Sequence, residues 1–223
     1  MAKKTQLREI RKNTQINLTS KQQESNLHQS IIKLVNYLEE KYDIIWKKTI
    51  KNTVIVEEMK KSGYENISCE KDNTNIKPDG GILYVKYKEE KYPILICEVK
   101  NQGTNDKRLE EGNKKQAQGN AIERLGKNVI GLKNYMLNYD IFPFVCFGYG
   151  CDFEEGSSIR DRVKTISGYI PFNKVHLYKY NGDDRCVGSF FFRSEEWSIE
   201  EMFSVLKEIS ERSINYYEEN IFK

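Results

Sequence analysis

Two short apolar runs, separated by a charged turn, constrain the fold of this chain more than any other feature. Residues 82–87 (ILYVKY) and 93–97 (PILIC) are rich in β-branched and aromatic side chains, which favour β-strands. The intervening residues 88–91 (KEEK) are few and polar, so the two strands are expected to pair as an antiparallel hairpin. The first predicted element is therefore a β-hairpin near the middle of the chain.

Charged side chains stand at the open end of this hairpin. Asp79 precedes the first strand, whereas Glu98 and Lys100 follow the second. The turn lies about midway between positions 79 and 98, so pairing of the strands brings Asp79 and Glu98 close together. Because side chains alternate along a strand, Glu98 and Lys100 share one face. Two carboxylates and an ammonium group are therefore expected to converge at one edge of the sheet.

The pattern of an acid, any residue and a lysine is weak evidence by itself. It also occurs at Glu39, Glu58 and Glu89, and only the copy at Glu98 follows an apolar strand and has a Pro-Asp turn upstream. The residues alone therefore leave two interpretations open, a metal site and a solvated strand end.

The composition indicates a folded protein with reduced cysteines. The chain has 223 residues, enough for one domain with a sizeable core, and 14 Tyr and 10 Phe argue against disorder throughout. A net charge of +3 is too small to identify a partner by itself. The five cysteines form no C-x-x-C pair, and with two histidines a zinc site is not expected. No secretory signal and no membrane span of about 18 apolar residues is found, so we expect a cytoplasmic protein.

Periodicity and capping signals predict helices on either side of the hairpin. The expected elements are helices at residues 21–42, 114–137 and from Ser198 onward, strands at 142–148, 175–180 and 187–192, and loops at 61–75, 101–113 and 149–162. Residues 181–184 would join the last two strands as a hairpin turn. The order of strand, helix and strand after residue 100 indicates a crossover connection. We therefore predict an α/β fold with a central mixed β-sheet flanked by helices, in a single domain of residues 1–223.

A second polar cluster lies near the start of the helix predicted at residues 114–137. The segment Gly119–Arg124 reads GNAIER. Asparagine can bond the N6 and N7 atoms of adenine, and arginine can reach acceptors in the major groove of DNA. The alternative is an ordinary solvated helix face, which the composition alone favours.

Together, these motifs resemble one family of enzymes. The segments 76–82 (IKPDGGI), 98–103 (EVKNQG) and 119–124 (GNAIER), with Lys127–Asn128, are similar to the EcoRI-like type II restriction endonucleases of the PD-(D/E)xK nuclease superfamily. The likeness continues through Met136–Leu137, residues 142–145 (FPFV), Asp161–Arg162 and residues 171–173 (PFN). It spans about residues 76–175, and the core expected from it is the restriction-endonuclease-like one.

The resemblance implies a homodimer that cuts both strands of a palindromic DNA site using Mg²⁺. If the family's residue roles are carried over by position, Asp79 and Glu98 would hold the metal, and the Val99 carbonyl would be a further ligand. Lys100 would orient or activate the attacking water. Mg²⁺ prefers such oxygen ligands. The host would also need a cognate DNA methyltransferase, which is not expected to form a stable complex with the nuclease.

The resemblance also implies which residues read the DNA. Related enzymes with a Gly-Asn-Ala-x-Glu-Arg motif cut sites with an AATT centre, which implies that centre here and GAATTC as the full site. The residues expected at the DNA are Gln116, Gln118, Gly119, Asn120, Ala121, Glu123, Arg124 and Arg162. Glu123 and Arg124 are also placed to couple the two subunits. The chain departs from the family pattern at Gln116, Gln118 and Ile159, near groups that read the outer base pairs.

Two other functions stay open at this stage. A repair or junction-resolving nuclease with the same core would recognise DNA structure rather than sequence, and the segment Gly119–Arg124 counts against it. A non-catalytic DNA-binding module would have no use for clustered carboxylates, which repel phosphates. The polar, basic residues 1–20 are expected to form either a frayed terminus or an arm that contacts DNA.

Overall fold

A computed structural model describes residues 2–101, 110–113, 120–179 and 187–222, with the backbone course alone for residues 2–20 and 120–121. Its helices are α1 (Ala2–Glu39), α2 (Asn52–Lys61), α4 (Asn120–Tyr135), α5 (Ser158–Ile166), α6 (Ile199–Asn220) and the short 3₁₀ helix η1 (Cys151–Phe153). Its strands are β1 (Ile44–Lys47), β2 (Ile50–Lys51), β3 (Asn75–Ile76), β4 (Gly81–Tyr87), β5 (Glu90–Asn101), β6 (Phe144–Tyr149) and β7 (Ser189–Arg193).

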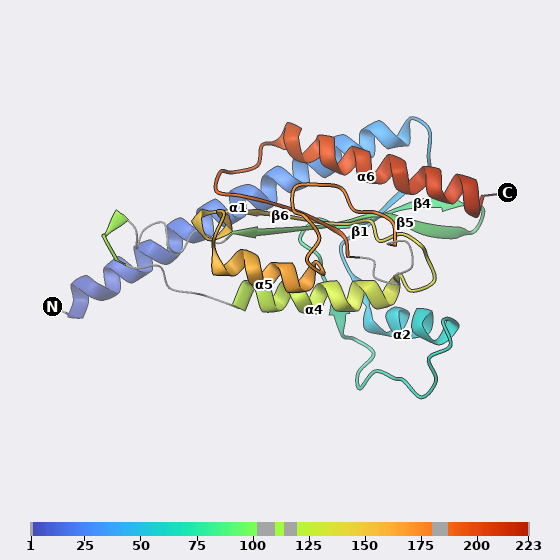
Figure 1. Ribbon diagram of the computed structural model, residues 1–223, viewed down its shortest axis with the longest axis horizontal. Helices are drawn as coiled ribbons and strands as arrows, with labels where there is room; N and C mark the ends of the chain where they lie inside the picture. Colours follow the sequence, from blue (N-terminus) through green and yellow to red (C-terminus); the bar gives the residue numbers. More distant parts are fainter. Residues whose placement is uncertain (1, 102–109, 114–119, 180–186, 223) are drawn as a thin grey trace.

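A five-stranded mixed sheet forms the centre of the molecule. The strand order is β1-β4-β5-β6-β7, in which β4 pairs antiparallel with both β1 and β5, and β6 pairs parallel with both β5 and β7. Helices α1 and α6 lie along one side of the sheet, and α4 and α5 lie on the other (Figure 1). The predicted α/β fold with a mixed sheet between helices is therefore confirmed.

The predicted hairpin is confirmed as β4 and β5, with a tighter turn than expected. The strands pair from Gly81 opposite Cys97 to Tyr87 opposite Glu90, which leaves two residues in the turn. Lys88 there adopts a φ of 54°, the left-handed conformation that two-residue hairpin turns require. Because β5 continues to Asn101, Glu98 and Lys100 lie inside the central strand of the sheet rather than after it.

The predicted crossover after the hairpin is also confirmed. Strand β5 leads through α4 to β6, which pairs parallel to β5. In α4, Leu125, Val129 and Leu132 are completely or almost completely buried, as the periodicity predicts. A Cβ atom at Gly131 would lie 2.2 Å from Cδ1 of Ile76, so α4 packs closely against β3.

Two helices on the far side of the sheet complete the core. The stripe of Leu27, Ile31, Leu34 and Leu38 in α1 is buried, as predicted. Helix α1 begins at Ala2 and so includes residues 2–20 of the polar basic segment. Helix α6 begins after the predicted N-cap Ser198, and its predicted core face of Met202, Leu206 and Ile209 is buried. Among the described residues, no helix is long and apolar enough to cross a membrane.

Two segments differ from the sequence-based expectations. Residues 149–162 are not a loop, because η1 and α5 form there, and Ser157 caps α5 by accepting a hydrogen bond from the Ile159 amide. Residues 175–179 form no strand and contribute only a bridge between Tyr178 and Ile141, so the predicted hairpin with residues 187–192 is wrong. Strand β7 instead pairs parallel to β6, where Phe190 and Phe192 are buried. The expected turn at residues 181–184 lies outside the described residues.

Candidate active site

Asp79 is held by a tight turn that leads into β4. The Gly80 amide donates a hydrogen bond to the Cys97 carbonyl at 3.0 Å, and the Gly81 amide donates one to the Pro78 carbonyl at 3.0 Å. A Cβ atom at position 80 would lie 2.6 Å from the Cβ of Cys97, so glycine allows the turn to approach β5 this closely. The turn therefore places Asp79 directly beside the end of the central strand.

The structure brings Asp79, Glu98 and Lys100 together. The Lys100 ammonium group donates hydrogen bonds of 2.7 Å to Oδ2 of Asp79 and of 2.7 Å to Oε2 of Glu98. Oδ2 of Asp79 also accepts a hydrogen bond of 3.2 Å from the Val99 amide. Lys100 and Glu98 share one face of β5, whereas Cys97 lies against the α1 side. The convergence expected from the hairpin is thus present, and Val99 takes part through its backbone.

Burial makes the charges of this cluster unusual. The Glu98 side chain is 0% exposed, and those of Lys100 and Asp79 are 15% and 28% exposed. Burial raises the pKa of Glu98 to about 7, although the charge of Lys100 opposes that rise. Burial also acts to raise the pKa of Asp79, but hydrogen bonds from Glu98 and Lys100 outweigh it and lower that pKa. Two carboxylates thus share one ammonium group, which favours the binding of a further cation.

Helix α4 adds a contact to Glu98 from a residue for which the sequence predicted no role. Nδ2 of Asn128 donates a hydrogen bond of 2.6 Å to Oε1 of Glu98. The sequence showed Asn128 only as part of the resemblance to the restriction enzymes. Its contact with Glu98 depends on how α4 lies over β5, and no local pattern signals that arrangement.

The residues expected to read DNA gather at the start of α4 and on α5. Asn120 and Ala121 begin α4, while their side chains are not described. Glu123 and Arg124 in its first turns are exposed, as is Arg162 on α5. Gln116, Gln118 and Gly119 lie outside the described residues. Ile159, at a departure from the family pattern, is 1% exposed and packs in the core.

The donor set of the cluster fits a hard divalent cation. The described part of the chain contains no group of three or more His, Cys, Asp and Glu side chains that could hold a metal. Asp79 and Glu98 supply two carboxylates that lie on either side of Lys100. Mg²⁺ is commonly bound by one or two carboxylates and keeps several waters, whereas a structural zinc site needs four nitrogen or sulfur ligands.

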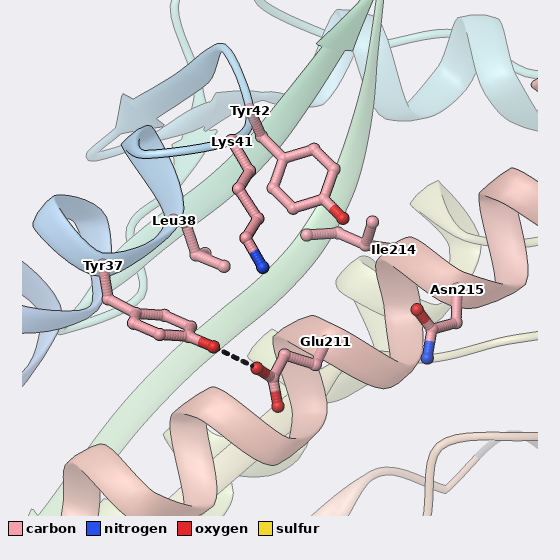
Figure 2. A pocket seen from close by; sticks show the side chains of 7 residues that line it. All are labelled: Tyr37, Leu38, Lys41, Tyr42, Glu211, Ile214 and Asn215. Carbon is pink, nitrogen blue, oxygen red and sulfur yellow. Dashed lines mark hydrogen bonds between the residues drawn. The ribbon is translucent and has the colours of Figure 1, made fainter.

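A pocket lies away from this cluster, between the end of α1 and α6 (Figure 2). The hydroxyl group of Tyr37 donates a hydrogen bond of 2.6 Å to Glu211 across it, and Lys41 extends over it (Figure 2). These helices cover the side of the sheet opposite α4 (Figure 1). The contact between Tyr37 and Glu211 therefore joins two helices and does not belong to the carboxylate cluster.

Comparisons with known proteins agree with this geometry. The family described as restriction endonuclease EcoRI matches residues 12–223. The type II restriction enzyme EcoRI of Escherichia coli is 29% identical over 221 residues, covering 80% of this chain and 78% of that enzyme. The type II restriction enzyme RsrI of Cereibacter sphaeroides is 42% identical over 91 residues, 37% of this chain and 33% of that enzyme. The match covers most of the chain, which therefore belongs to the EcoRI family of restriction endonucleases.

Proposed function

We propose that this enzyme is a Mg²⁺-dependent deoxyribonuclease that cuts both strands of a palindromic site with an AATT centre, GAATTC being the full site. The observation that carries the proposal is the Lys100 ammonium group bonded at 2.7 Å to both Asp79 and Glu98. Membership of the EcoRI family supports the choice of duplex DNA as the substrate.

The cluster has the groups that phosphodiester hydrolysis needs. Asp79 and Glu98 would hold Mg²⁺, with the Val99 carbonyl as a further ligand. A bound Mg²⁺ would offset the negative charge that develops on the phosphate and lower the pKa of a nearby water. The oxygen of that water would bond to phosphorus as one phosphorus–oxygen ester bond breaks, with the water losing a proton to solvent and the leaving oxygen gaining one. Lys100, which two carboxylates hold in place, would orient the water and stabilise the developing oxyanion.

The start of α4 would supply sequence recognition. We assign base reading to the first turns of α4 and the residues before them, which are Gln116, Gln118, Gly119, Asn120, Ala121, Glu123 and Arg124. Arg162 of α5 would lie near the outer base pairs. An asparagine bonded to both N6 and N7 of adenine discriminates against other bases, which suits an AATT centre. A homodimer would present two copies of this surface to the two halves of a palindrome. A cognate methyltransferase would protect the host DNA.

Digestion of DNA of known sequence tests this proposal. The purified chain is incubated with a sequenced plasmid in Mg²⁺ or EDTA, and the fragment ends are sequenced. Discrete ends at GAATTC in Mg²⁺ alone are the expected result, and ends at other AATT-centred palindromes would correct the outer base pairs. Preferential cutting of branched DNA would favour a junction nuclease. Specific binding without cutting in any divalent metal would favour a binding protein.

A further inference from the structure

The Glu98 carboxylate is held at both of its oxygens. Lys100 donates to Oε2 at 2.7 Å and Asn128 donates to Oε1 at 2.6 Å, while the side chain is 0% exposed. A buried carboxylate is costly unless its oxygens accept hydrogen bonds. The two donors come from different elements, Lys100 from β5 and Asn128 from α4. Together they fix the plane in which the Glu98 carboxylate lies.

The packing of α4 against the core holds Asn128, the second of these donors, in place. Leu125, Val129 and Leu132 on the same helix are at most 1% exposed. At Gly131 the helix comes so close to β3 that a Cβ atom would meet Ile76 at 2.2 Å. Strand β3 precedes the turn that holds Asp79, so one helix packs near both carboxylates. The position of the Asn128 amide group is therefore set by core packing.

The same helix begins at the residues assigned to base reading. Asn128 is eight residues after Asn120, a distance of about 12 Å along a helix with a rise of 1.5 Å per residue. One continuous helix thus joins the recognition segment to the buried carboxylate.

We propose that Asn128 is a positioning residue, which orients the Glu98 carboxylate toward the metal and links α4 to the cutting site. This inference rests on the proposed function. Residues that hold metal ligands in place typically change metal affinity or activity by about 10- to 100-fold when they are removed. The alternative is that Asn128 only satisfies a buried carboxylate and contributes to folding stability.

Three measurements on Asn128→Ala separate these roles. They are Mg²⁺ binding by titration calorimetry, kcat and KM for cutting as Mg²⁺ is varied, and affinity for the same duplex in EDTA. We expect Mg²⁺ affinity and kcat to fall by about 10- to 100-fold, while KM and DNA affinity in EDTA stay within threefold. Asn128→Leu, which is similar in size and uncharged but lacks the amide donor, should show the same losses. Asn134→Ala is the matched control, because it alters an asparagine about 9 Å further along α4.

Each outcome decides the proposal. Wild-type kcat and Mg²⁺ affinity in Asn128→Ala, with only a lower melting temperature, would overturn it in favour of a structural role. Equal losses in Asn134→Ala would overturn it as well. If the wild-type chain cuts no DNA, the proposed function fails, and calorimetry on wild type and Asn128→Ala still decides whether Asn128 positions a metal ligand. Absence of Mg²⁺ binding by the wild-type chain would overturn both.

Discussion

At the scale of single residues, the proposed chemistry rests on two carboxylates and one ammonium group that hold one another in place. Lys100 lies 2.7 Å from each of Asp79 and Glu98, and burial raises the pKa of Glu98 to about 7. Removing one member of a buried ionic group leaves the others uncompensated, which costs about 3–5 kcal/mol unless they change protonation. Substitutions here should therefore affect both the reaction and stability, and each test needs a folding control.

Lys100→Ala should reduce DNA cutting by at least about 100-fold, because charge stabilisation at the reacting phosphate is lost. Single-turnover cutting of a GAATTC duplex in saturating Mg²⁺ measures the rate, and thermal unfolding reports the folded fraction. Lys86→Ala is the matched control, since Lys86 is an exposed lysine on β4 of the same hairpin. A folded Lys100→Ala variant that cuts at the wild-type rate would refute the role given to Lys100.

Asn128 illustrates which residues a sequence does and does not reveal. The proximity of Asp79 to Glu98 follows from a hairpin whose turn lies midway between them, which is a local property of the chain. The bond from Asn128 to Glu98 depends on the rotation and height of α4 above β5. That arrangement is set by the burial of Leu125, Val129 and Leu132, so a tertiary structure is needed to find it.

At the scale of elements, α4 combines the core face with the predicted recognition segment. Asn120→Ala should relax the preference for AATT by about 10- to 100-fold, because a bidentate contact to a base contributes about 1–3 kcal/mol of discrimination. Competitive cutting of GAATTC against duplexes with one changed central base pair measures the effect. Asn134→Ala, near the other end of α4, should keep full discrimination. Retention of wild-type discrimination by Asn120→Ala would remove Asn120 from the recognition set.

Helix α6 depends on the capping box at its first turn. Glu201 accepts hydrogen bonds from the two terminal guanidinium nitrogens of Arg193, at 2.6 and 2.8 Å, and one from the Ser198 amide at 2.9 Å. The hydrogen bonds from Arg193 and then from Ser198 lower the pKa of Glu201 to about 2. Because the folded-state pKa is lower than the usual 4.5, this stabilisation is complete above pH 4.5 and is lost as the pH falls toward 2.

Glu201→Gln should therefore cost about 1 kcal/mol of unfolding free energy at pH 7 and progressively less below pH 4.5. Urea unfolding at a series of pH values gives the difference from wild type. Glu200→Gln is the control, since the neighbouring Glu200 side chain is 72% exposed and pairs only with Lys33 among the described residues. A difference that does not shrink between pH 4.5 and pH 2.5 would rule out the carboxylate as its source.

Elements with a strong local signal were predicted, and those without one were not. The hairpin of β4 and β5 has dense β-branched runs, and α6 has an N-cap followed by regular apolar spacing. Helix α5 has nine residues and only two buried apolar ones, Ile159 and Val163, so its charged sequence is typical of a loop as well. Strand β7 joins β6 in parallel, a long-range pairing that the turn-like sequence near residue 182 does not indicate.

At the scale of the whole molecule, the sheet places the proposed chemistry and the proposed recognition on the same side. The carboxylate cluster is bonded to α4, whereas α1 and α6 cover the other side of the sheet (Figure 1). The sequence predicted the crossover after β5 that carries α4, but not which side of the sheet each helix covers. It could not give the order of the outer strands, because β1 and β7 pair with partners that are distant along the chain. Homodimer formation, which a palindromic site favours, stays a prediction.

Cutting of a duplex library with a randomised central block tests the central claim most directly. The library is incubated with the wild-type chain in Mg²⁺, in EDTA, and with Lys100→Ala in Mg²⁺, and the new ends are sequenced. We predict ends at AATT-centred palindromes, with GAATTC most enriched, for the wild-type chain in Mg²⁺ alone. Ends without sequence preference, or the same ends produced in EDTA or by a folded Lys100→Ala variant, would contradict the account.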